Sequence, residues 1–164
     1  MQRIFIIRHA EAENTPQSAE RDDTKRALTK RGIRRMRKGV QGLSTLVDNL
    51  AIIATSPLTR AIQTAEIIAT AFPRAKLVSL SDLAPGFDQA KLLTFVVGNS
   101  GTIALIGHEP DLSNLVSYLA TTNSREIVRL KKGGVCCLEF ASKVQAGKAK
   151  ISWLLTSKQL SKLG

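Results

Sequence analysis

Three short apolar runs constrain the fold of this chain more than any other feature of its sequence. They cover residues 4–7, 50–54 and 102–106, and polar or charged residues follow each run within two positions. Runs of this length, without alternating polar side chains, are typical of strands buried on both faces in the middle of a parallel sheet. Such strands require helices on both sides of the sheet.

Segments with helical periodicity separate the apolar runs. Thr29 can cap a helix extending to about residue 47, because apolar side chains recur there at three- and four-residue steps. The Ser56 hydroxyl, followed by Pro57 at the first helical position, predicts a second helix start, and Pro73 should end that helix. Two shorter helices are expected over residues 88–97 and 110–120.

The remaining strands complete the predicted architecture. One is expected at residues 76–80, and the last two, at 135–140 and 149–155, are close enough to form a hairpin. Right-handed crossovers place every strand-to-helix loop on one rim of a parallel sheet. We therefore predict a single domain over residues 1–164 with a three-layer α/β/α fold, in which a mostly parallel sheet has a mixed edge. A length of 164 residues with 43% hydrophobic residues allows one proper core.

Composition disfavours several functional classes. The apolar runs are too short to span a bilayer, and a strand that begins within four residues of the N-terminus leaves no space for a signal peptide. We therefore expect a cytoplasmic protein without membrane association. Cys136 and Cys137 are adjacent in a predicted strand and should point to opposite faces, which indicates reduced packing residues. His9 and His108 are the only histidines, so neither a metal site nor another cofactor is expected.

The net charge of +11 favours anionic partners, and much of it lies within residues 21–38. We expect most of these side chains to be solvated on a helix face, after an irregular surface loop over residues 14–27. A nucleic-acid- or anion-binding protein is the alternative from a different class. It is not the favoured one, because the basic segment lacks interleaved aromatic residues; Tyr118 and Trp153 lie elsewhere.

Chemically distinctive residues follow the three apolar runs. Arg8 and His9 follow the first run, Arg60 lies one helical turn beyond the second, and His108 follows the third. Each of these residues alone is typical of an ordinary loop or helix surface. Because ligands bind at the carboxyl ends of strands in open α/β sheets, their joint occurrence on one rim favours a phosphoryl-binding pocket that contains a nucleophile.

Four stretches carry a resemblance to a known family. They are residues 8–11 (Arg-His-Ala-Glu), 23–32, 56–65 (from Ser-Pro-Leu-Thr-Arg) and 106–110 (Ile-Gly-His-Glu-Pro). In this order they resemble the histidine phosphatase superfamily, which has the phosphoglycerate-mutase-like fold. The resemblance covers nearly the whole chain and is greatest to the small phosphohistidine phosphatases of the SixA type.

The resemblance implies a role for five residues. His9 matches the nucleophile that becomes phosphorylated. Arg8 and Arg60 match the two arginines that clamp the phosphate, and His108 matches the histidine that hydrogen-bonds the transferring phosphoryl group. Arg26 matches a further arginine near the phosphate.

This chain also departs from the family pattern. Ala10 replaces the glycine of the broader family, and Thr15 stands where mutases have an asparagine ligand. The glutamate that many members use as a general acid, supplied after the Arg60 helix, has no match. The nearest acidic candidates are Glu11, Asp82 and Asp88.

Phosphoryl transfer requires mainly that the reacting groups are positioned and that the charge of the phosphoryl oxygens is compensated. His9 should be neutral, because nearby arginines disfavour an imidazolium, and a backbone carbonyl should set its tautomer. Glu109 is expected to help keep His108 protonated.

The absence of a match to the family's general-acid glutamate affects which substrate is expected. An alkyl phosphate leaves as an alkoxide and benefits strongly from a proton donor, whereas imidazole is a better leaving group. The expected function is that of a phosphohistidine phosphatase acting through a phospho-His9 intermediate on a phosphohistidine-bearing protein, such as a signalling protein. The alternative enzyme is a phosphomonoesterase for small phosphorylated metabolites.

Overall fold

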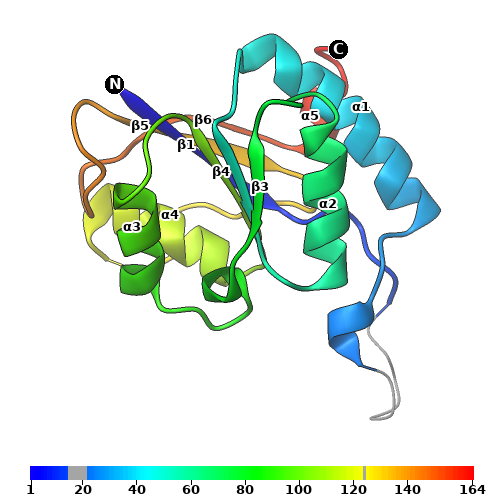
Figure 1. The fold of residues 1–164 in the computed structure, drawn as a ribbon, viewed down its shortest axis with the longest axis horizontal. Helices are drawn as coiled ribbons and strands as arrows, with labels where there is room; N and C mark the ends of the chain where they lie inside the picture. Colours follow the sequence, from blue (N-terminus) through cyan, green and yellow to red (C-terminus); the bar gives the residue numbers. More distant parts are fainter. Residues whose placement is uncertain (15–21, 124) are drawn as a thin grey trace.

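A six-stranded mixed sheet forms the centre of the protein (Figure 1). A computed structural model describes residues 1–14, 22–123 and 125–164. The strand order is β3-β2-β4-β1-β5-β6; β1 to β4 are parallel, and β5 and β6 are antiparallel to their neighbours. The strands are β1 (Gln2–Arg8), β2 (Ile52–Thr55), β3 (Lys76–Ser79), β4 (Ile103–Gly107), β5 (Val135–Phe140) and β6 (Lys150–Leu155). This arrangement confirms the predicted sheet with a mixed edge.

Helices cover both faces of the sheet, as predicted (Figure 1). Helices α1, α2 and α5 lie on one side, and α3 and α4 lie on the other. Two single 3-10 turns, η1 and η2, lie in the connections before α1 and after β3. The bounds are α1 (Lys30–Leu46), α2 (Thr59–Ala69), α3 (Gln89–Val97), α4 (Asp111–Thr121), α5 (Ser157–Leu160), η1 (Asp23–Lys25) and η2 (Ser81–Leu83).

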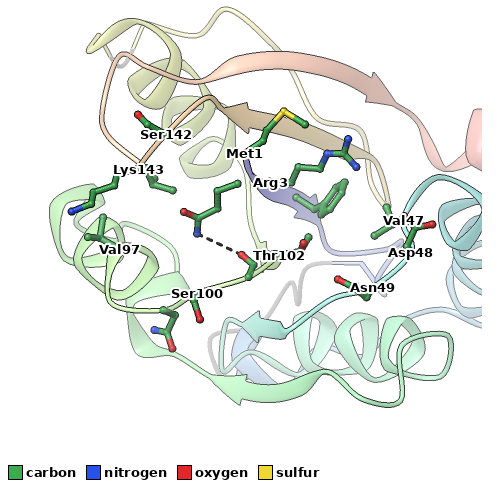
Figure 2. Close-up of a pocket in the computed structure, with 15 residues that line it drawn as sticks. Met1, Arg3, Val47, Asp48, Asn49, Val97, Ser100, Thr102, Ser142 and Lys143 are labelled. Carbon is green, nitrogen blue, oxygen red and sulfur yellow. Dashed lines mark hydrogen bonds between the residues drawn. The ribbon is translucent and has the colours of Figure 1, made fainter.

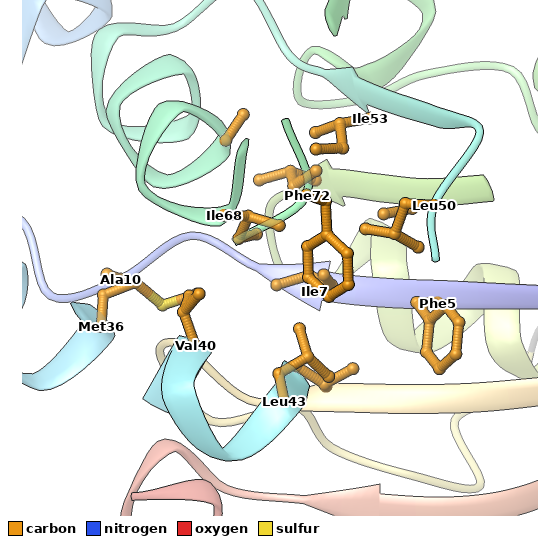
Figure 3. Close-up of a cluster of buried hydrophobic side chains, with 14 of the residues drawn as sticks. Phe5, Ile7, Ala10, Met36, Val40, Leu43, Leu50, Ile53, Ile68 and Phe72 are labelled. Atoms are coloured by element: carbon orange, nitrogen blue, oxygen red, sulfur yellow. The ribbon is translucent and has the colours of Figure 1, made fainter. Parts of the chain in front are cut away.

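The central strand β1 divides the hydrophobic interior into two cores. Phe5 and Ile7 belong to the core beneath α1 and α2 (Figure 3). Ile4 and Ile6 belong to the core beneath α3 and α4. Alternation of side chains along a strand, with all four residues fully or almost fully buried, explains why this run contains no polar residue.

The adjacent cysteines follow the same alternation in β5. Cys136 packs in the core on the α4 side and Cys137 in the core on the α1 side, and both thiols are free. Burial raises their pKa values to about 12 and about 11. They are therefore protonated packing residues, as the sequence predicted.

Two helix starts differ from the prediction. The second helix begins at Thr59 rather than Pro57, and it ends at Ala69, before Pro73. The Ser56 hydroxyl accepts from the Leu58 amide at 3.3 Å, which forms a turn before the helix rather than a side-chain cap. This extended entry carries the chain from the rim of the sheet onto its face.

The fourth helix differs in a similar way, because Pro110 is its N-cap and not its first residue. Of the predicted surface loop over residues 14–27, residues 15–21 lie outside the described residues, and residues 23–25 form η1. In the described part of the chain, no helix is long and apolar enough to cross a bilayer.

Candidate active site

The carboxyl ends of three adjacent strands bring the predicted residues together. In the sheet, β4 lies between β1 and β2. The His9 amide donates to the Gly107 carbonyl at 3.1 Å, and the Ser56 amide donates to the Ile106 carbonyl at 2.9 Å. The three loops that carry His9, Ser56 and His108 are therefore joined to one another by backbone hydrogen bonds, which fixes their relative positions.

The two histidine rings face each other in this buried rim. Their centroids lie 5.1 Å apart, and the side chains of His9 and His108 are 6% and 4% exposed. The His9 Nδ1 atom lies 2.7 Å from the Ala10 carbonyl oxygen. A carbonyl can only accept, so Nδ1 carries the proton and Nε2 keeps its lone pair. This geometry confirms the expected tautomer.

Burial is the main reason that His9 is neutral. The pKa of His9 is lowered to about 3, mainly by burial and with smaller contributions in the same direction from His108, Arg60 and Arg8. The hydrogen bond to Ala10 opposes this shift. The expected neutral imidazole is present, but desolvation contributes more to it than the arginines do.

His108 is held by the residue that was expected to cap the second helix. Its Nε2 atom lies 2.8 Å from the Ser56 hydroxyl, while Nδ1 is buried and has no hydrogen-bond partner among the described residues. The pKa of His108 is lowered to about 4, mainly by burial and next by the charge of Arg60. An anion beside these groups would oppose both effects and favour the imidazolium.

Glu109 does not have the expected role. Its carboxylate accepts from the Ser113 hydroxyl at 2.9 Å, and its charge acts on Arg8 rather than on His108. Glu109 and His108 are consecutive residues in the turn before α4, and their side chains have different partners. The prediction that Glu109 keeps His108 protonated is therefore wrong, because burial and Arg60 dominate the pKa of that histidine.

Arg60 is held by a carboxylate that sequence reasoning did not single out. It lies in the first turn of α2 and is 4% exposed. Its Nη1 donates to the Asp23 carbonyl at 3.0 Å, and its Nη2 lies 3.2 Å from the Asp23 carboxylate. The same carboxylate lies 3.0 Å from Nε of Arg26, and Nη1 of Arg26 donates to the Glu13 carbonyl at 3.1 Å. Asp23 therefore links the two arginines; the i, i+3 spacing of Asp23 and Arg26 was the available signal.

Arg8 is the last residue of β1. Its Nη1 donates to the Leu130 carbonyl at 3.0 Å, and its Nε is buried with no hydrogen-bond partner in the described part of the chain. The Nε of Arg60 is likewise buried with no hydrogen-bond partner among the described residues. Burial lowers the pKa of both guanidinium groups, although arginine stays charged in proteins.

The Thr64 hydroxyl connects the loop after β1 to helix α2. The Ala10 amide donates to the Thr64 hydroxyl at 3.0 Å, and that hydroxyl donates to the Arg60 carbonyl at 2.7 Å. The neighbouring Gln63 side chain accepts from the Leu28 amide at 2.8 Å. Helix α2 thereby holds both the loop after β1 and the segment that follows η1.

The three sequence-derived acid candidates have other contacts. Glu11 lies 3.6 Å from Arg31 and 3.5 Å from Arg35, and Asp88 caps α3. Asp82 lies in η2, where the structure describes no contact between it and His9, His108, Arg8 or Arg60. Asp23 does contact the cluster, but it accepts from guanidinium groups and so acts as an acceptor rather than a proton donor.

This arrangement can bind a tetrahedral anion and attack it. Among the described residues, the Nε atoms of Arg8 and Arg60 are buried donors with no hydrogen-bond partner or ion pair, and an unsatisfied buried donor costs about 1–3 kcal/mol. Phosphate oxygens would accept from such donors, with the free lone pair of His9 beside them. Within the described ranges, no group of three His, Cys, Asp or Glu side chains could hold a metal ion.

A separate pocket lies at the opposite end of the sheet (Figure 2). It is lined by the start of β1 and by Ser100 and Thr102 before β4, and it has a volume of about 790 Å³. Arg3 beside it already forms an ion pair with Glu139 at 3.0 Å. This pocket includes neither histidine, so its size does not connect it with the chemistry of the opposite rim.

Comparison with known proteins agrees with the sequence motifs. The profile of the histidine phosphatase superfamily (branch 1) matches residues 4–84. The chain is 33% identical over 159 residues to an uncharacterized protein of Picosynechococcus sp., covering 94% of this chain and 95% of that protein.

Solved structures show the same fold. The protein histidine phosphatase SixA, complexed with tungstate, matches with a TM-score of 0.78 and 21% identity, covering 96% of this chain and 99% of that chain. A phosphoserine phosphatase of Entamoeba histolytica, in complex with phosphoserine, matches with a TM-score of 0.71 and 16% identity, covering 98% of this chain and 100% of that chain. These likenesses confirm the fold that the sequence predicted.

Proposed function

Because this chain belongs to the histidine phosphatase superfamily and is a phosphatase of that type, we propose that it hydrolyses phosphohistidine on a protein through a phospho-His9 intermediate. The observation that carries this proposal is the contact between His9 Nδ1 and the Ala10 carbonyl at 2.7 Å. It leaves the Nε2 lone pair free for attack in a buried cluster with His108, Arg8 and Arg60.

The proposed reaction has two steps. In the first, His9 Nε2 forms a bond to phosphorus while the bond from phosphorus to the substrate imidazole breaks, and that imidazole takes up a proton from solvent. In the second, a water oxygen forms a bond to phosphorus while the bond from phosphorus to His9 Nε2 breaks; one proton of the water stays on the inorganic phosphate, the other returns to solvent, and His9 is again neutral. Arg8, Arg60 and His108 would bind the phosphoryl oxygens in both steps, and Arg26 would support Arg60 through Asp23.

The lack of a proton donor in contact with the two histidines, among the described acid candidates, supports phosphohistidine rather than an alkyl phosphate as the substrate. None of the acid candidates, Glu11, Asp82 or Asp88, contacts the two histidines in the described part of the chain. Transfer of a phosphoryl group from one imidazole to another is nearly balanced in energy and needs less proton donation than alkoxide departure.

A phosphomonoesterase for small phosphorylated metabolites is the second candidate. The fold similarity to the phosphoserine phosphatase favours this alternative. The similarity covers 100% of that chain, and its structure is in complex with phosphoserine. A single comparison of leaving groups separates the two candidates. Hydrolysis rates should be measured with a phosphohistidine protein, phosphoramidate, an aryl phosphate and an alkyl phosphate.

The proposed function predicts a steep dependence of rate on the pKa of the leaving group. Phosphohistidine and phosphoramidate should react fastest, the aryl phosphate next and the alkyl phosphate slowest. An acid-labile phosphate should map to His9 after brief reaction, and His9→Ala should not form it. Equal rates for alkyl phosphate and phosphohistidine would overturn the substrate assignment, and a phosphate on another residue would overturn the nucleophile.

We further propose that the protein acts in the cytoplasm on a partner that presents its phosphohistidine at the surface. The net charge of +11 supports an anionic partner. Nucleic acid is the competing partner class, and salt-dependent binding to duplex DNA with an affinity above that for acidic protein would support it instead.

A further inference from the structure

A second pocket adjoins the nucleophile loop, on the side of β1 that faces α1 and α5. It has a volume of about 480 Å³. Its walls come from the loop after β1, one side of α1, the segment before β5 and the start of α5. The residues of these walls that carry charge are Arg8, Glu11, Arg35, Lys131, Lys132 and Lys158.

The pocket has a marked surplus of positive charge. Lys131, Lys132 and Lys158 are exposed, and the structure describes no ion pair for any of them. The carboxylate among the described wall residues is that of Glu11, which lies between Arg31 and Arg35 at 3.6 and 3.5 Å. One negative charge is thus shared by two arginines, and the lysines opposite remain available to a ligand.

This basic pocket is fixed rigidly to the nucleophile loop. The Gly133 amide donates to the carbonyls of Arg8 and His9, both at 3.1 Å, and the Arg8 amide donates to the Gly134 carbonyl at 3.2 Å. Arg8 and Ala10, the two chain neighbours of His9, line the pocket. A chain that reaches the catalytic rim therefore passes within a few residues of these lysines, since an extended chain advances about 3.3 Å per residue.

The pocket at the other end of the sheet shows that this charge is local. Its cationic side chains are Arg3 and Lys143 (Figure 2), and Arg3 already contacts Glu139 at 3.0 Å. Asp48 also lines that pocket. The pocket beside the rim with the two histidines therefore carries more unpaired positive charge than the pocket at the opposite end of the sheet.

We propose that the basic pocket binds an acidic segment of the phosphorylated partner protein, close in sequence or space to its phosphohistidine. This inference rests on the proposed function, in that the partner is a protein. Charge complementarity identifies the occupant: a run of Asp and Glu side chains matches three unpaired lysines around a pocket with one shared carboxylate. The segment would raise the association rate and lower KM without touching the reacting atoms.

A matched pair of triple variants tests this proposal. Lys131→Gln/Lys132→Gln/Lys158→Gln removes the three charges at the pocket. Lys143→Gln/Lys148→Gln/Lys150→Gln removes the same total charge from exposed positions near the start of β6, remote from this pocket. The probes are a labelled non-phosphorylated peptide rich in Glu and Asp, and a matched peptide with Gln and Asn. Both are measured by fluorescence anisotropy with inorganic phosphate present to occupy the catalytic rim.

The acidic peptide should bind the unmodified protein more tightly than the amide peptide. Three exposed charge pairs together contribute about tenfold in affinity, so the pocket variant should bind about tenfold more weakly and the control variant nearly normally. With an acidic phosphohistidine peptide, the pocket variant should show a raised KM and an unchanged kcat. With phosphoramidate, both constants should remain unchanged.

Three outcomes would overturn the proposal. Equal weakening by both triple variants would show a general field of the protein, and unchanged binding by the pocket variant would exclude the pocket. Tighter binding of a short DNA duplex, lost in the pocket variant, would assign the pocket to nucleic acid. If phosphohistidine is not hydrolysed while the acidic peptide still binds at these lysines, the proposed function fails and the acidic-segment site stands.

Discussion

Gly32 lies where helix α1 touches the nucleophile loop, and replacing it tests how that loop is held. A Cβ atom at this position would overlap the Glu11 carbonyl oxygen and would lie 2.9 Å from the Glu11 carbonyl carbon. That oxygen also accepts from the Thr29 amide at 3.0 Å. The obstacle is therefore backbone two residues beyond His9, and it cannot rotate away as a flexible side chain would.

Gly39 provides a matched control on the same helix. A Cβ atom there would meet Ser157 Oγ at 3.6 Å and Leu160 Cβ at 3.9 Å, which are ordinary contacts. Gly39→Ala should stabilise the protein by about 0.5–1 kcal/mol, because alanine loses less backbone entropy in a helix. Gly32→Ala gains the same helix propensity but forces a backbone shift, so it should destabilise the protein by about 1–3 kcal/mol.

Urea unfolding followed by circular dichroism measures both free energies, and aryl phosphate hydrolysis measures the consequence for the site. Gly32→Ala should lower kcat/KM by about tenfold to a hundredfold, because the Glu11 shift is transmitted to His9, while Gly39→Ala should leave it unchanged. The reasoning is refuted if Gly32→Ala is as stable and active as Gly39→Ala. It is also refuted if Gly32→Ala loses stability but keeps full activity.

Three further predictions concern the chemistry. Arg60→Lys should fold normally but lose most activity, because lysine lacks the planar fork that Asp23 holds; near-normal turnover would show that Arg60 does not bind the phosphoryl group. His108→Ala should reduce turnover by several hundredfold, roughly 3–4 kcal/mol, while phospho-His9 still forms slowly; normal turnover would refute its role. Burial lowers the pKa of His9 to about 3 and of His108 to about 4, from an ordinary value of 6.5. The unfolded chain therefore binds more protons below pH 6.5, and stability should fall from about pH 6.5 down to about pH 3. In a His9→Asn/His108→Asn variant this part of the fall should disappear from urea titrations at several pH values, and an unchanged profile would contradict the assignment.

The sequence by itself determined the layout of the fold and which residues lie together at the rim of the sheet. Hydrophobic periodicity distinguishes a doubly buried strand from an amphipathic helix, because it reports which faces of each element are covered. Parallel strands with right-handed crossovers then require His9, Arg60 and His108 to share a rim, whatever the detailed angles of the helices. The expected tautomer of His9 also followed, because its partner, the Ala10 carbonyl, is the next residue in the chain.

Only the tertiary structure decided which side chains hold the cluster in place. Asp23 and Arg60 are 37 positions apart, and Ser56 and His108 are 52 apart, so no local pattern could pair them. By helix propensity alone Gly32 is an unfavourable residue, whereas the close approach of the Glu11 backbone requires it. Such pairings depend on how far and at what angle two elements approach. Those quantities are set by the packing of the whole core, and the period of one segment does not contain them.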